Sequence, residues 1–86
     1  MSQDPVLRGA RIRQFLEDEA VIWALGELRK ENYAMFRTAA TPHDLLAAQA
    51  RGQVLEMFEA TMRAVVDVGE VEEHRREHDA QDVTVR

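Results

Sequence analysis

The chain has 86 residues and a formal net charge of −5, from 16 acidic and 11 basic side chains. A chain of this length forms one small domain at most, and such domains are marginally stable unless they are cross-linked or oligomeric. The absence of cysteine excludes disulfides and thiolate metal sites. The acidic balance argues against a surface built to grip nucleic-acid phosphates.

The opening residues, MSQDPVLRGARIRQ, lack the apolar core of a signal peptide. No run approaches the ~18 uninterrupted apolar residues of a membrane span. We therefore expect a soluble, cytoplasmic protein that makes no contact with a membrane.

Residues 1–9 are predicted to be a flexible N-terminal segment, although Asp4-Pro5 has the residue order of a helix start. From residue 10 to about residue 38 no proline intervenes and most residues are good helix formers. The sequence therefore predicts one helix over 10–38. Glu17, Asp18 and Glu19 would point in three directions on it, so they form no acid–base pair.

The stretch from Phe15 to Leu28 holds the only tryptophan and is apolar on two sides. At about 100° per residue, one side carries Ile12, Phe15, Leu16, Ile22 and Trp23. The other side carries Val21, Leu25, Leu28, Met35 and Phe36. Two apolar faces predict two packing partners, one inside the chain and one outside it. Whether the face of Trp23 or that of Leu25 turns outward is left open by the pattern.

Thr41, Pro42 and Asp44 form a helix start that resembles a capping box. A second helix is predicted over 42–68, antiparallel to the first because the connection is short. Its apolar residues alternate spacings of four and three, as in a coiled coil, along the seam Ala47, Arg51, Val54, Phe58, Thr61, Val65 and Val68. Gly26 and Gly52 fall at about the same level, which predicts a close approach of the two helices there.

Gly69 is predicted to end or weaken the second helix. Residues 69–86 are highly charged and are predicted to be a tail that is partly helical or disordered. His74, Glu77 and His78 match the inverted zinc-protease pattern, but they lie in a polar tail without apolar walls. We expect these residues to be part of a run of charged side chains exposed to solvent. We also expect no metal site, no cofactor and no catalytic residues in the chain.

The order of features resembles that of small helical-hairpin proteins from the head and packaging gene clusters of tailed bacteriophages. The resemblance covers about residues 10–68. It rests on RIRQFLEDE from Arg11 to Glu19, TPHD from Thr41 to Asp44, Ala50-Arg51, and Val54-Leu55. Some of these proteins are similar to small terminase subunits, the ring-forming DNA-recognition components of packaging motors. The resemblance implies ring or oligomer formation and, for a phage-encoded chain, the cytoplasm of the host cell.

Together these patterns predict an all-α fold, an antiparallel coiled-coil-like hairpin of two helices that assembles into an oligomeric bundle or ring. The expected function is non-enzymatic self-association, in phage assembly or genome packaging. The expected partners are other copies of the chain and a phage head or packaging protein. The alternative is an adaptor or inhibitor that binds one protein through the apolar stripe of the first helix. The predicted interface residues are Phe15, Ile22, Trp23, Leu25, Leu28, Phe58 and Met62. Arg8, Arg11 and Arg13 are candidate nucleic-acid contacts.

Overall fold

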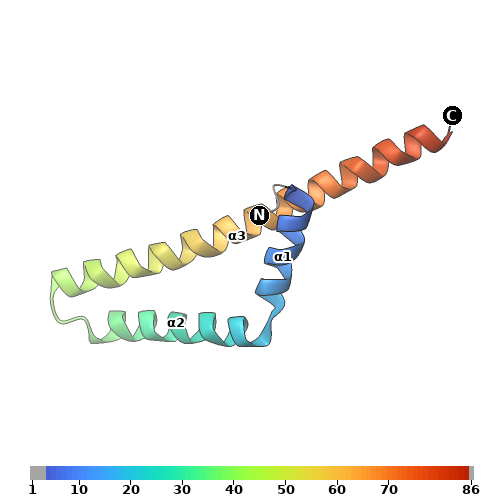
Figure 1. Cartoon of the computed structure of the whole chain (residues 1–86). Helices are drawn as coiled ribbons and strands as arrows, with labels where there is room; N and C mark the ends of the chain where they lie inside the picture. Colours follow the sequence, from blue (N-terminus) through green and yellow to red (C-terminus); the bar gives the residue numbers. More distant parts are fainter. Residues whose placement is uncertain (1–3, 86) are drawn as a thin grey trace.

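The computed structural model describes the backbone of residues 4–85 and the side chains of residues 4–80. The structure is all-α, as predicted, with helices α1 (Pro5–Glu17), α2 (Glu19–Thr38) and α3 (Pro42–Val85). Figure 1 shows α2 running antiparallel beside the first half of α3, while α1 turns away from α2 and crosses α3 near its middle. The far end of α3 projects beyond this crossing.

The single helix predicted over 10–38 is wrong, because the chain breaks at Asp18. Its backbone is extended (φ −66°, ψ 128°). Its carboxylate accepts hydrogen bonds from the N–H groups of Ala20 (2.9 Å) and Val21 (3.3 Å). Asp18 is therefore the N-cap of α2, and the break lets α1 leave the axis of α2. The faces of α1 and α2 consequently do not form one continuous surface.

The N-terminal end of α1 also differs from the prediction. Asp4 caps the helix through a 3.0 Å hydrogen bond from the Val6 N–H, and Pro5 takes the first helical position. Residues 5–9 therefore belong to α1 rather than to a flexible segment. Residues 1–3 of that predicted segment lie outside the described residues.

The start of α3 has the predicted capping arrangement. The Asp44 N–H donates to Thr41 Oγ1 (3.1 Å), and the Asp44 carboxylate accepts from the Ala40 N–H (3.3 Å). The first bond satisfies one of the N–H groups that the start of the helix leaves unpaired. The second bond goes to Ala40, the residue before the cap, and not to the Thr41 N–H that a capping box would use. Hydrogen bonds between residues of the turn itself therefore stabilise the connection between α2 and α3.

Two glycines allow α1 to cross α3. A Cβ atom on Gly69 would lie 2.8 Å from the Pro5 carbonyl oxygen and 3.0 Å from Gly9 Cα. A Cβ atom on Gly9 would lie 3.1 Å from the Val65 carbonyl oxygen. Gly69 thus permits contact between backbones and does not end the helix, which continues to Val85. The predicted end of the helix at Gly69 is therefore wrong, whereas the helical alternative predicted for the charged residues after it agrees with the structure.

The contact between α2 and α3 uses the Leu25 face of α2, and Trp23 lies outside with 69% of its surface exposed. Asn32 Nδ2 donates to the Ala48 carbonyl oxygen at 2.9 Å. The Asn32 side chain lies over Gly52, while Gly26 has nothing within 4 Å of the Cβ it lacks. The predicted pairing of Gly26 with Gly52 is therefore wrong.

The interior formed by these contacts is thin. Among the described residues, Ala48 and Met62 are the only hydrophobic side chains that are buried. The chain extends over 69 × 24 × 23 Å with a radius of gyration of 19.1 Å, whereas a compact domain of this length has about 12 Å. The helices are thus arranged as an open frame whose apolar side chains remain largely uncovered.

Candidate interaction surface

The chain exposes more surface than a compact protein of its mass. Its accessible surface is 7043 Å², whereas a folded monomer of 9.8 kDa exposes about 5200 Å². The surplus of roughly 1,900 Å² includes the charged end of α3 and large hydrophobic side chains that are exposed, among them Trp23, Met57 and Val71. A standard protein interface removes about 800 Å² from each partner, so the surplus is large enough for an interface.

On α3, the side that faces α1 and α2 follows spacings of four and three. These residues are all buried or half-buried: Ala48, Gly52, Leu55, Glu59, Met62, Val66 and Gly69. The predicted seam through Val54, Phe58 and Thr61 is offset from this set by one residue, and these three side chains are exposed. The predicted seam is therefore not the one that holds the chain together.

The opposite side of α3 is exposed and carries no charge from Leu46 to Val71, at about 100° per residue. We call this surface the outer stripe. Its central members are Met57, Thr61, Ala64 and Val68, with Val54 and Phe58 toward one edge. Met57 is 68% exposed and Val54 is 65% exposed. An exposed apolar surface of this length is typical of an interaction site.

The predicted interface residues divide between the outside and the inside of the chain. Phe15, Ile22 and Trp23 are exposed at 44%, 55% and 69%, and Phe58 is exposed on the outer stripe at 48%. Leu25 and Leu28 are half-buried on the face that meets α3. Met62 is buried at 7% exposure, so in this arrangement it packs within its own chain. Met57, Leu46 and Val71, for which the sequence pattern predicted no interface role, are also exposed on α3.

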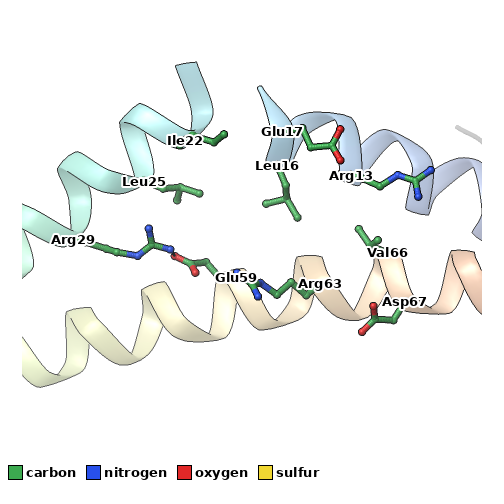
Figure 2. A pocket seen from close by; sticks show the side chains of 10 residues that line it. All are labelled: Arg13, Leu16, Glu17, Ile22, Leu25, Arg29, Glu59, Arg63, Val66 and Asp67. Atoms are coloured by element: carbon green, nitrogen blue, oxygen red, sulfur yellow. Dashed lines mark hydrogen bonds and ion pairs between the residues drawn. The ribbon is translucent and has the colours of Figure 1, made fainter. Parts of the chain in front are cut away.

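The break at Asp18 opens a cleft of about 590 Å³ between α1, α2 and α3. Figure 2 shows Leu16, Leu25 and Val66 pointing into it from the three helices, with Ile22 at its rim. Charged side chains of both signs surround this apolar floor: Arg13, Arg29, Arg63, Glu17, Glu59 and Asp67. Arg29 and Glu59 form an ion pair across the cleft. Because the charges balance, the cleft has no preference for an anion or a cation.

The structure separates the three candidate nucleic-acid contacts. Arg13 Nη1 lies 3.2 Å from Glu70 Oε1 of α3 and borders the cleft. Arg8 and Arg11 lie about 60° apart around the helix, and Arg13 lies about 140° from Arg8. Arg8 lines a groove between α1 and α3, and Arg11 is exposed. The three guanidinium groups therefore do not form one cationic cluster in a single chain.

The histidines of the projecting end of α3 lie in an exposed charge network. His74 Nδ1 lies 3.7 Å from Glu77 Oε2 of the same helix. Arg75 bridges Glu72 (2.6 Å) and Asp79 (3.1 Å). Within the described part of the chain, no group of three or more His, Cys, Asp or Glu side chains converges on a metal-sized space.

One ion pair ties this projecting helix to the N-terminal end of α1. Arg76 Nη2 lies 3.1 Å from Asp4 Oδ1, and the Val6 N–H donates to the same oxygen. The hydrogen bond from Arg76, followed by that from Val6, holds the pKa of Asp4 below its ordinary value. Hydrogen bonds from Arg75 lower the pKa of Glu72 in the same way.

The Arg76→Gln variant is expected to raise the pKa of Asp4 toward its ordinary value, because the principal cause of the shift is removed. The folded pKa of Asp4 is lowered, so its stabilising contribution is present above the unfolded pKa and is lost as the pH falls through the folded pKa. The Arg76→Gln protein should therefore show a weaker loss of stability at acidic pH. Carboxyl-carbon NMR titration measures the pKa of Asp4, and unfolding curves recorded over the same pH range measure the loss of stability.

Arg75→Gln is the matched control, since Arg75 pairs with Glu72 and Asp79 inside α3. It should raise the pKa of Glu72 and leave that of Asp4 unchanged. An Asp4 titration that is identical in the Arg76→Gln and wild-type proteins would show that α1 does not contact this part of α3 in solution.

Among the described residues, none of the helices is long and apolar enough to cross a membrane. Comparison of the chain with family models, curated proteins and solved structures finds no match.

Proposed function

We propose that the chain is a self-associating helical protein that acts by assembly rather than by catalysis. The observation that carries the proposal is a mismatch. Among the described residues only Ala48 and Met62 are buried hydrophobic side chains, whereas many large hydrophobic side chains are exposed. Burial of apolar surface is the main favourable contribution to folding, and here much of that surface remains for another chain to cover. The outer stripe and the cleft supply this surface on different sides of the molecule.

The two surfaces support assemblies larger than a dimer. A surface that binds its own copy gives a closed two-fold pair, and a second interface on another surface of each chain can join such pairs into a larger assembly. The outer stripe and the cleft are separate surfaces of one chain. This arrangement is compatible with the ring or bundle that the resemblance to small terminase subunits implies, and we propose phage assembly or genome packaging as its setting.

The exposed pair Ile22 and Trp23 on α2 favours the adaptor function as the second candidate. An exposed tryptophan beside a branched aliphatic side chain is the kind of anchor that dominates protein interfaces. This function needs a chain that stays monomeric and folded until its partner is added. The two candidates therefore predict different masses for the isolated protein.

Light scattering at micromolar concentration tests the proposal directly. We expect a mass at least twice the 9.8 kDa of one chain, together with a helical circular-dichroism spectrum. A folded species of 9.8 kDa across the micromolar range would reject self-association and favour the adaptor. Repeating the measurement with duplex DNA at low and high salt tests phosphate contacts, since those weaken steeply with salt.

A further inference from the structure

The outer stripe has an uneven shape along its length. Its N-terminal half carries the large side chains of Met57 and Phe58, while its C-terminal half carries the smaller Thr61 and Ala64. Each half also holds a valine, Val54 or Val68. Beside the C-terminal half, a groove of about 370 Å³ runs between α3 and the start of α1, where Pro5 and Arg8 form the other wall. One half of the stripe therefore protrudes and the other half is hollow.

The charges on the same side of α3 change abruptly at the end of the stripe. No charged residue lies on it between Leu46 and Val71, and then Glu72, Arg75 and Asp79 follow on the same face. The stripe is about 37 Å long at 1.5 Å per residue. Its two ends are therefore chemically different, and this restricts how a second helix can lie along it.

We propose that the partner of the outer stripe is a second copy of the chain, packed with its α3 antiparallel to the first about a two-fold axis near Phe58 and Thr61. This inference rests on the proposed self-association and specifies its geometry. In this arrangement the protruding half of each stripe faces the hollow half of the other. Met57 of each copy lies at the level of Thr61 of the other copy, and Val54 lies at the level of Ala64.

The antiparallel direction follows from both shape and charge. In a parallel pair the bulky halves would meet each other, and Glu72, Arg75 and Asp79 would each face the same residue of the second copy. Like charges placed opposite each other are destabilising. In the antiparallel pair Glu72 lies at the level of Leu46, the end of the partner's stripe, and Arg75 and Asp79 lie beyond that end. Arg75 therefore keeps its ion pairs with Glu72 and Asp79. The contact is also self-complementary, as a two-fold interface requires.

Because the chain contains no cysteine, single cysteines can report the direction of the pair. Ala50 and Val68 lie on the outer stripe at equal distances from the proposed axis, so Ala50→Cys of one copy faces Val68→Cys of the other. We expect a refolded mixture of the two variants to form the mixed disulfide under mild oxidation, and each variant alone to remain mostly reduced. Intact mass spectrometry separates the mixed disulfide from the two symmetric ones.

Met57→Glu, introduced into both cysteine variants, should reduce the yield of the mixed disulfide at least tenfold. Gln49→Glu is the matched control: it adds the same charge to α3 at an exposed position on another side of the helix, and it should leave the yield unchanged. Circular dichroism of both variants distinguishes loss of the interface from loss of the helices.

The outcomes separate this geometry from self-association itself. If the wild-type protein is an oligomer and the two cysteine variants form the mixed disulfide, the antiparallel pair is supported. If the wild-type protein is an oligomer but the variants form symmetric disulfides at position 50 or 68, the pair is parallel, and the inference is overturned while self-association stands. An oligomer that forms none of the three disulfides places the interface elsewhere and overturns it as well. A wild-type monomer of 9.8 kDa overturns the proposed function together with the pair.

Discussion

The Gly69→Ala variant is expected to detach α1 from α3. The added Cβ would lie 2.8 Å from the Pro5 carbonyl oxygen and 3.0 Å from Gly9 Cα. Both are backbone atoms, so rotation of a side chain cannot relieve the overlap and the helices must separate. Overpacking of this kind costs about 1–3 kcal/mol, whereas alanine in a helix gains about 1 kcal/mol over glycine. We expect a net loss of packing at the crossing.

Gly26→Ala is the control for the same change at an uncrowded position. Nothing lies within 4 Å of the Cβ it would add, so the variant should gain roughly 0.5–1 kcal/mol from helix propensity alone. Urea unfolding compares the two variants, and hydrogen exchange of the α1 amides locates the loss. If Gly69→Ala gained as much stability as Gly26→Ala, with protected α1 amides, the close crossing would be rejected.

Gly69 also shows why only part of the fold could be predicted from the sequence. The helical content and the cap at Thr41 depend on local propensity, and the structure has both. Gly69 has the sequence signature of a helix end, and only the return of α1 onto α3 gives it another role. A long-range contact of this kind leaves no local pattern.

The break at Asp18 is a second feature of the fold that the local sequence pattern does not predict. The run Glu17-Asp18-Glu19 contains neither glycine nor proline, so nothing local excludes a continuous helix. Aspartate is a good N-cap and a modest helix former, and this was the only available signal. The break allows α1 to reach α3, where it packs against Gly69.

The seam of α3 was misplaced because the helix carries two sets of small or apolar residues, one position apart. The inner set contains Ala48, Gly52 and Gly69. Alanine has a small side chain and glycine has none, so a pattern of large hydrophobic residues does not identify these positions as buried. These residues allow close helix contact, while the larger Val54, Met57 and Phe58 are exposed. The two apolar faces predicted for one helix are divided between α1 and α2, because the helix breaks at Asp18. Within α2, the Leu25 face meets α3 and Trp23 is exposed.

The unfolding midpoint is expected to rise with protein concentration. With Ala48 and Met62 as its only buried hydrophobic side chains in the described region, one chain has little core of its own, so stability must come from contacts between chains. Association that stabilises only the folded state adds about 2.7 kcal/mol when the binding partner reaches 100 times its dissociation constant. Thermal or urea unfolding over a hundredfold range of concentration should therefore show a clear shift.

Met57→Glu provides the internal comparison for this measurement. The substitution places a charge in the middle of the outer stripe and changes no residue that faces α1 or α2. It should lower the midpoint and flatten its dependence on concentration, whereas Gln49→Glu should behave as wild type. A wild-type midpoint that stays constant over the whole range would mean that the open frame of helices is stable alone, and the apolar surface would then be left for a different protein.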